Sequence, residues 1–223
     1  EKKYELEREE FQSNDVASDQ VKKNILYLRI DAFSEQVVSD VKEELAQGNY
    51  QKGLILDLRD NPGGILSVAT DFAALFLSNG AIVSYDIANG DRKTIQADGS
   101  AKINVPVAIL INQNTASSAE VVAGALQDRN RAVLVGVNTF GKGSVQESLK
   151  LANGSSIEIT VGRLRTPSGK FIEGVGIKPD LSASESQSLP KAIKLINALS
   201  DISKPADQKS FPNSNVQSSG NDG

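Results

Sequence analysis

The chain has 223 residues, a net charge of −4 at neutral pH, and the apolar and charged fractions of a soluble globular protein. This length suits one large domain or one domain with extensions, and the absence of a basic stripe argues against nucleic-acid binding. Histidine and cysteine are both absent, which excludes a Ser-His-Asp triad, a Cys-His pair, disulfides and thiolate metal sites.

The first regular element follows a charged segment, residues 1–22, which we expect to be an arm. Ordered structure should begin with an apolar, β-branched strand at residues 24–30. Hydrophobic periodicity then predicts alternating helices and strands as far as residue 137. The predicted segments are a helix over 34–47 with Ser34 as its cap, a strand over 53–58, a helix over 67–78, a hairpin over 82–97, a strand over 105–111, a helix over 117–128 and a strand over 132–137.

Strand–helix repeats of this kind indicate an α/β core with a mostly parallel sheet. The pattern changes after Lys142, where residues 145–151 and 156–164 alternate like antiparallel strands around an Asn153-Gly154 turn. The sequence therefore predicts an added antiparallel β region on the α/β core.

The chain divides into a core and two C-terminal segments. The core is expected over residues 23–182, followed by a helical extension over 183–202 with its helix at about 189–199. Residues 203–223 are polar and rich in Ser, Asn, Gly and Pro, which predicts a disordered tail.

Ser117 stands at the head of an apolar helix pattern and has two explanations. With Glu120 three positions later it matches a capping box, which accounts for both residues structurally. A nucleophile at this place would lie beside unpaired N–H groups and the positive end of the helix dipole, which favour an oxyanion. Because the chain has no histidine, the base for such a serine must be a lysine, an aspartate or a glutamate.

Lys142 lies between two glycines. Counted from Gly136 it fits the spacing of a phosphate-binding loop, but Gly143 stands where that motif needs Ser or Thr, and a strand pattern follows instead of a helix. A solvated turn lysine is the ordinary explanation. A general base is the functional one, and it requires that burial strip the charge, with Phe140 and Val145 as candidate apolar walls.

Two further segments carry alternative explanations. Asn61-Pro62-Gly63-Gly64 follows a buried strand and is either a tight loop or a set of backbone N–H groups that approaches a substrate carbonyl. Asp57 and Arg59 are close enough in sequence to form a pair that supports this loop. Gln146 is either an exposed strand residue or a partner of Lys142, and a contact between them requires the chain to bend at Gly143.

Four segments, taken in order, resemble the C-terminal processing, or tail-specific, serine protease family. They are Asp57–Gly64, Asn114–Asp128, Thr139–Gln146 and Gly174–Asp180, and the resemblance spans about residues 24–181. It implies a crotonase-like α/β core, a Ser–Lys dyad and cleavage of proteins near their C-termini through an acyl-enzyme.

The resemblance also implies a role for each matching residue. It places the nucleophile at Ser117, the base at Lys142 and an orienting amide at Gln146. The implied oxyanion hole consists of the N–H groups of Gly64, or Gly63, and Ser118. The residues implied to support the site are Glu120, Thr139, Asp57 and Arg59.

The chain departs from the family pattern in three places, one of which is the polar tail beyond about residue 185, which matches no part of that pattern. The family reads Ala then Ser after the nucleophile, whereas this chain reads Ser118 then Ala119. A shifted register would make Ser118 the nucleophile, but the spacing to Lys142 favours Ser117. Family members also carry a PDZ module before the core, and none is visible here, so residues 1–22 are interpreted as an arm or the remnant of that module.

The family resemblance implies protein or peptide substrates bound through their C-terminal segments, and an extracytoplasmic location in the periplasm, the cell envelope or outside the cell. Methionine is absent, so we expect a processed or excised form, and no apolar run approaches the ~20 residues that span a bilayer. An N-terminal anchor missing from this chain would bring it to a membrane surface. We expect no cofactor and no metal, and the sequence leaves the oligomeric state open.

Two rival functions remain at this stage. One is a catalytically silent module that binds proteins or peptides on the same core. The other is a crotonase-type acyl-CoA enzyme, which shares the fold class and the paired N–H groups but leaves the spacing of Ser117 and Lys142 unexplained.

Overall fold

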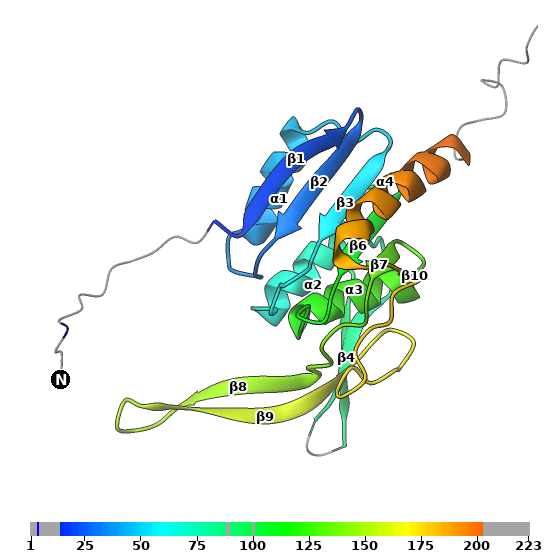
Figure 1. The fold of residues 1–223 in the computed structure, drawn as a ribbon. Coiled ribbons are helices and arrows are strands. Elements are labelled where there is room, and N and C mark those ends of the chain that lie inside the picture. The colour runs from blue at the N-terminus through cyan, green and yellow to red at the C-terminus, as the bar shows by residue number, and fades with distance from the viewer. Residues whose placement is uncertain (1–3, 5–13, 88–89, 100, 203–223) are drawn as a thin grey trace, which may run out of the picture.

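The larger of two sheets forms the centre of the molecule (Figure 1). The computed structural model describes residues 4, 14–87, 90–99 and 101–202, apart from the side chain of Glu147. The sheet has six strands in the order β1-β2-β3-β6-β7-β10, and all neighbours are parallel except β1 and β2. The strands are β1 (Val16–Lys22), β2 (Ile25–Ile30), β3 (Gly53–Asp57), β6 (Val107–Ile111), β7 (Val133–Gly136) and β10 (Leu181–Ser182).

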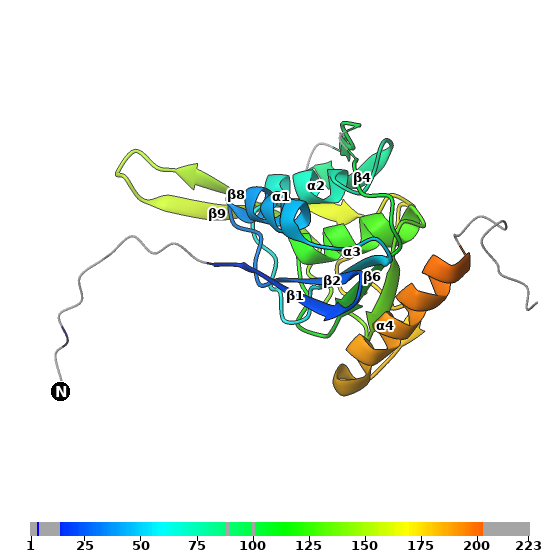
Figure 2. The same cartoon turned by 90° about the horizontal axis from the view of Figure 1, so that it is seen from above.

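Helices cover both faces of this sheet. Three of them, α1 (Val37–Gln47), α2 (Leu66–Ala74) and α3 (Ser118–Asp128), lie on one face, and α4 (Glu185–Ile202) lies on the other (Figure 2). Successive side chains of β3 therefore pack against opposite layers of helices. Leu54 and Leu56 belong to the core beneath α1, α2 and α3, whereas Ile55 packs with Ala192 and Ile196 of α4. Every residue of β3 is therefore buried, as expected of a parallel strand covered on both faces.

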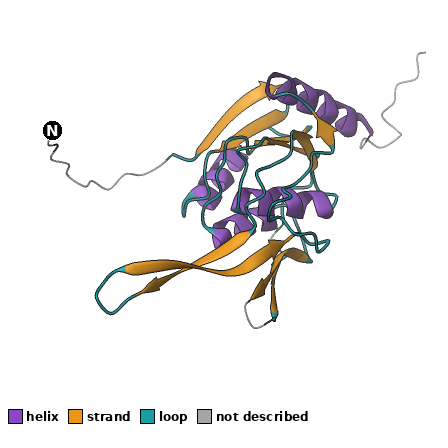
Figure 3. Ribbon diagram, turned by 60° about the horizontal axis from the view of Figure 1, so that its bottom comes forward, coloured by secondary structure: helices purple, strands orange, loops and turns teal. Residues whose placement is uncertain are grey.

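The smaller sheet is entirely antiparallel, with the order β5-β4-β9-β8. Its strands are β4 (Ala81–Ile87), β5 (Arg92–Gln96), β8 (Ser144–Lys150) and β9 (Ser156–Arg165). Beyond the contact of β9 with β4, the β8–β9 hairpin continues as a two-stranded ribbon that projects from the body (Figure 3). The predicted α/β core with an added antiparallel region is confirmed. Among the described helices, none combines the length and apolar character that a bilayer crossing requires.

Several predicted boundaries were wrong. The sheet begins at Val16, because residues 16–22, predicted as part of a charged arm, pair with β2. Only Val16 of this strand is buried, so no alternation marks it in the sequence. Helix α1 begins at Val37, and its N-cap is Gln36 instead of Ser34.

The C-terminal helix is longer than predicted. It begins at Glu185 instead of about Leu189, and the carbonyl of Ser184 accepts the N–H groups of Gln187 and Ser188 at 3.0 and 2.9 Å. The predicted tail at 203–223 lies outside the described residues.

The carboxyl ends of three neighbouring parallel strands, β3, β6 and β7, meet at one edge of the sheet. The register pairs Asp57 with Leu110 and Ile111 with Gly136, so these strands end at nearly the same level. Three loops therefore start side by side at this edge. They are the glycine loop after β3, which contains Gly63 and Gly64, the serine turn after β6, which carries Ser117, and the lysine loop after β7, which carries Lys142.

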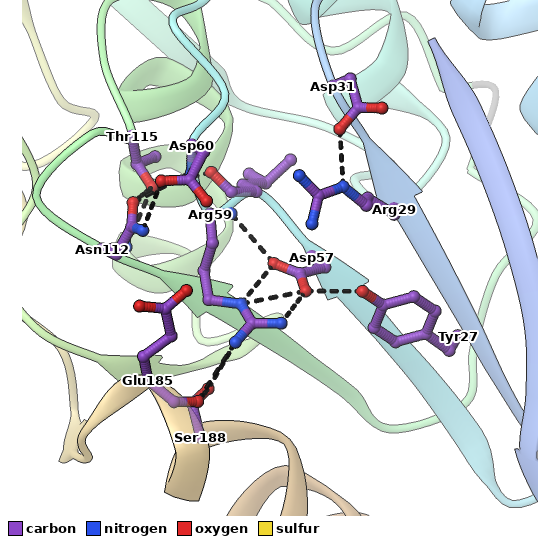
Figure 4. Close-up of polar contacts among 11 residues, drawn as sticks. Tyr27, Arg29, Asp31, Asp57, Arg59, Asp60, Asn112, Thr115, Glu185 and Ser188 are labelled. Carbon is purple, nitrogen blue, oxygen red and sulfur yellow. Dashed lines mark hydrogen bonds and ion pairs between the residues drawn. The ribbon is translucent and has the colours of Figure 1, made fainter. Parts of the chain in front are cut away.

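Asp57 and Arg59 form the predicted pair, and they join the sheet to α4 (Figure 4). The Asp57 carboxylate is fully buried and also accepts the Tyr27 hydroxyl at 2.6 Å. Burial, together with this bond, raises the pKa of Tyr27 to about 12. Arg59 donates to the Glu185 carbonyl and the Ser188 hydroxyl, both at 3.2 Å. The pair thus fixes the start of the glycine loop against α4.

We expect Asp57→Asn to lower the free energy of unfolding by about 3 kcal/mol, because it leaves a largely buried guanidinium without its counter-charge. Urea denaturation at neutral pH measures this loss. The matched control is Asp31→Asn, which breaks the exposed pair with Arg29 and should cost less than about 1 kcal/mol. Equal losses in the two variants would contradict the structural role of the buried pair.

Candidate active site

Ser117 occupies a strained turn between β6 and α3. Its backbone angles are φ 56° and ψ −123°, whereas an ordinary N-cap residue lies in the β region. A positive φ is costly for a serine, and such strain is typical of functional sites. The Glu120 half of the capping box is formed, since its carboxylate accepts the Ser117 N–H at 2.9 Å. The cap alone does not explain why the backbone adopts this conformation.

The Glu120 carboxylate connects the serine turn to the lysine loop. It is fully buried and accepts the N–H of Ser117 at 2.9 Å, the Thr139 hydroxyl at 2.6 Å and the N–H groups of Gly141 and Lys142 at 2.7 and 2.8 Å. One carboxylate thus accepts four donors from two different loops. The backbones of Ser117 and Lys142 are held in a fixed relation by this side chain.

The segment Gly174–Asp180 supports the lysine loop from behind. The Thr139 hydroxyl accepts the Ile177 N–H at 2.6 Å, and the Asp180 carboxylate accepts the Leu134 N–H at 2.8 Å. At Gly176, where φ is +70°, an added Cβ would lie 2.5 Å from the Thr139 carbonyl oxygen, so only glycine permits this approach. The fourth segment singled out in the sequence therefore packs beneath the site.

The two glycines of the glycine loop have different roles. The Gly63 N–H donates to the Asn61 side chain at 2.8 Å, which corrects the prediction that included Gly63 among the oxyanion donors. Gly63 instead allows close packing, since an added Cβ would lie 2.8 Å from the Ser117 Cβ.

Gly64 is exposed, and among the described residues neither its N–H nor that of Ser118 has a hydrogen-bond partner. The Ser118 hydroxyl donates to the Gly64 carbonyl at 3.2 Å, so the two residues adjoin. Gly64 and Ser118 are the donor pair that remains for an oxyanion hole.

Hydrogen bonds that sequence reasoning missed fasten the glycine loop to the serine turn. The Asp60 carboxylate accepts the side-chain amides of Asn114 and Asn112 at 2.8 and 2.9 Å, and these bonds hold the pKa of Asp60 below its usual value. The Ala116 N–H donates to the Asn61 carbonyl at 2.9 Å. The only signal in the sequence was a cluster of Asn residues after a buried strand.

A pocket of about 460 Å³ brings Ser117, Ser118, Lys142 and Gln146 together. Its remaining lining consists of Pro62, Gly64, Ile65, Leu66, Ser144, Val145 and Leu164. A larger pocket of about 670 Å³ lies at the far end of α3 and contains none of these four residues. Asp57 and Arg59 do not line the pocket that contains Ser117, because Arg59 bonds to α4 and Asp57 is buried beside Arg59 and Tyr27.

Lys142 lies in this pocket with an exposed side chain, which corrects the expectation of a buried lysine. Phe140 is 66 % exposed and forms no wall, whereas Val145 packs against the core and lines the pocket as predicted. The reason is that the loop is anchored through its backbone, with the Gly143 N–H bound to Glu173 at 2.7 Å. Within the described part of the chain, the Lys142 ammonium bonds to neither Ser117 nor Gln146.

A serine at a strand-to-helix turn, with a lysine in the same pocket on a two-sheet α/β core, is the arrangement of a serine-type peptidase. Residues 24–183 match peptidase family S41, and the chain belongs to this family.

Two of its curated relatives are named as carboxyl-terminal processing proteases. The carboxyl-terminal-processing protease of Synechocystis sp. is 42% identical over 156 residues, which cover 69% of this chain and 36% of the relative. The carboxy-terminal processing protease of Bacillus subtilis is 34% identical over 85% of this chain and 41% of the relative. The solved photosystem II D1 C-terminal processing protease superposes with a TM-score of 0.71 at 29% identity, covering 85% of this chain and 54% of that one. The chain therefore spans less than half the length of these two curated relatives.

We expect Glu120→Gln to lower the free energy of unfolding by about 3 kcal/mol. The side-chain NH₂ group that replaces one carboxylate oxygen is a donor, and it would face two groups that now donate to that oxygen. Urea denaturation measures this loss. The exposed Glu158→Gln on the ribbon serves as the control and should stay within about 0.5 kcal/mol of the wild type. Wild-type stability in Glu120→Gln would show that the carboxylate does not hold the two loops.

Proposed function

We propose that this chain is the catalytic core of a serine endopeptidase that cleaves proteins near their C-termini, with Ser117 as nucleophile and Lys142 as base. The observation that carries the proposal is the shared Glu120 carboxylate, which binds the backbone N–H of both residues at 2.9 and 2.8 Å. Family membership and the names of the relatives support the same reaction class.

The proposed reaction runs through an acyl-enzyme. The neutral Lys142 amine takes the hydroxyl proton as Ser117 Oγ attacks the peptide carbonyl carbon. The negatively charged oxygen of the tetrahedral intermediate accepts hydrogen bonds from the N–H groups of Gly64 and Ser118. The C–N bond then breaks, and Lys142 gives its proton to the leaving amine. Water attacks the acyl group, Lys142 takes a proton from that water, and the proton returns to Ser117.

The exposed lysine must approach the serine for this reaction. A peptide that fills the pocket excludes water, which disfavours the charged amine and strengthens its attraction to the hydroxyl. Gln146 lines the same pocket, and in this proposal its side chain orients the amine once the amine turns inward. We therefore infer that the dyad closes when substrate is bound.

The pocket walls suit an apolar substrate side chain beside the scissile bond, because Ile65, Leu66, Val145 and Leu164 line it. Protein or peptide substrates held through their C-terminal segments fit this site. We place the chain outside the cytoplasm, as the family resemblance implies. Tail selection by a further module, such as a PDZ module, is part of the same proposal.

A catalytically silent binding module is the second candidate. One observation favours it, namely that Lys142 is exposed and forms no bond to Ser117 among the described residues. Covalent labelling of Ser117 by a fluorophosphonate separates the two candidates, since only an activated serine reacts.

Replacing either member of the dyad should abolish turnover of an unstructured peptide. We expect Ser117→Ala and Lys142→Arg each to lower kcat by about 10²–10⁴-fold or more, because arginine keeps the charge but does not release its proton. Peptide hydrolysis followed by mass spectrometry measures the loss, and circular dichroism verifies the fold. Lys93→Arg, on exposed β5, is the matched control and should retain wild-type turnover. Wild-type turnover in Lys142→Arg would refute the lysine base.

The rate of Ser117 labelling should increase with pH, because only the neutral amine accepts the hydroxyl proton. We expect an increase of up to about tenfold per pH unit in the wild type and a weaker dependence in Lys142→Ala. Fluorophosphonate labelling in buffers from about pH 6 to 9 measures the profile. A flat wild-type profile would count against Lys142 as the base.

A further inference from the structure

The strand β8 leads directly out of the catalytic pocket and has one unpaired side. Ser144 and Gln146 line the pocket with Ser117, and the strand continues to Lys150. In the described part of the smaller sheet, β8 is an edge strand with β9 as its only neighbour. A free strand edge is a template for pairing with another extended chain.

The register shows which backbone groups point outward. The Leu151 N–H bonds to the Ser155 carbonyl at 2.8 Å, and the Leu164 N–H bonds to the Gly143 carbonyl at 2.6 Å. Because hydrogen-bonded positions alternate in an antiparallel pair, residues 143, 145, 147, 149 and 151 face β9. The N–H and C=O groups of Ser144, Gln146, Ser148 and Lys150 consequently face away from β9. They form a row about 20 Å long that starts in the pocket.

The side chains of the ribbon divide into two faces. Leu149, Leu151, Ile157 and Ile159 share one face, and these residues are 48, 47, 45 and 39 % exposed. The register places Glu147, opposite Ile159, at the pocket end of the same face. The opposite face carries only polar residues, namely Gln146, Ser148, Lys150, Ser156, Glu158 and Thr160. An apolar stripe beside a free edge offers both main-chain pairing and side-chain burial to a further strand.

We propose that β8 binds the substrate segment on the amino-terminal side of the scissile bond as an additional antiparallel strand. This inference rests on the proposed peptidase function and names how that site holds its substrate. Alternate apolar side chains of the substrate pack on the face formed by Leu149, Leu151, Ile157 and Ile159. The preferred substrate is therefore an unfolded segment with apolar residues at every second position.

The direction of β8 supports this orientation. The strand runs from the pocket outward, so an antiparallel partner runs toward Ser117 and brings its carboxyl end into the pocket. Cleavage near a C-terminus leaves the longer part of the substrate on the amino-terminal side, where the ribbon extends. Ser144 and Gln146 belong to both the pocket and the edge, and this continuity favours a substrate over a second copy of the chain as the occupant.

A scan with N-methylated peptides tests strand pairing. A fluorescent peptide carries one backbone N-methyl group at successive positions before the scissile bond, and its affinity for the Ser117→Ala variant is measured by anisotropy. We expect a roughly fivefold loss at alternate positions and little change between them, since only alternate N–H groups face β8. A uniform effect, or none, would overturn the proposal. Binding requires no turnover, so the result is independent of whether the chain cleaves peptides.

A pair of ribbon variants tests the same edge from the protein side. Ser148→Pro removes an N–H that faces away from β9, and prolines are tolerated at such edge positions. The matched Ser148→Ala variant keeps the N–H. We expect the ratio of kcat/KM for a long over a short peptide to fall toward one in Ser148→Pro and to stay at the wild-type value in Ser148→Ala. Equal ratios of kcat/KM in the two variants would contradict strand pairing with β8. If Ser148→Pro disturbs the ribbon itself, the scan with N-methylated peptides decides whether the substrate pairs with β8.

Discussion

The site depends on one buried carboxylate. Glu120 has no exposed surface, and a charge in such a place is stable only when hydrogen bonds replace the water that it has lost. Its four donors come from the serine turn and from the loop after β7, so satisfying the charge fixes both segments together. The bond from the Ser117 N–H to Glu120 and the close packing of Gly63 hold the strained backbone of Ser117 in place.

The sheet makes that interaction possible. Three neighbouring parallel strands end at one level, and their loops carry the glycines, the serine and the lysine. Hydrogen bonds from Asn112 and Asn114 to Asp60 join the loop after β6 to the glycine loop after β3. Glu120 joins the turn that carries Ser117 to the loop that carries Lys142. On the other face, Arg59 holds α4 to the start of the glycine loop. The pocket that holds Ser117 and Lys142 thus rests on contacts that join segments distant in the chain.

Much of the fold was predictable because it follows from local patterns. Buried strands such as β3 and the alternation of β8 and β9 are visible in the sequence, whereas β1 is not, since it is mostly exposed. The candidate site residues were identified from the order of four segments along the chain, but most contacts among these residues depend on the tertiary structure. The bond from the Gly63 N–H to the Asn61 side chain spans only two residues and is of a kind that a local sequence pattern can indicate. Nothing local reveals that Phe140 turns outward and that Lys142 is exposed.

The central claim is that a filled pocket brings Lys142 onto Ser117 while Glu120 holds their backbones in place. The most direct measurement is a crystal structure of the chain with a peptide boronate bound to Ser117. We predict that the Lys142 Nζ lies within about 2.6–3.2 Å of the Ser117 Oγ and that a boronate oxygen accepts the N–H groups of Gly64 and Ser118. A bound adduct with the lysine side chain still directed into solvent would contradict the account.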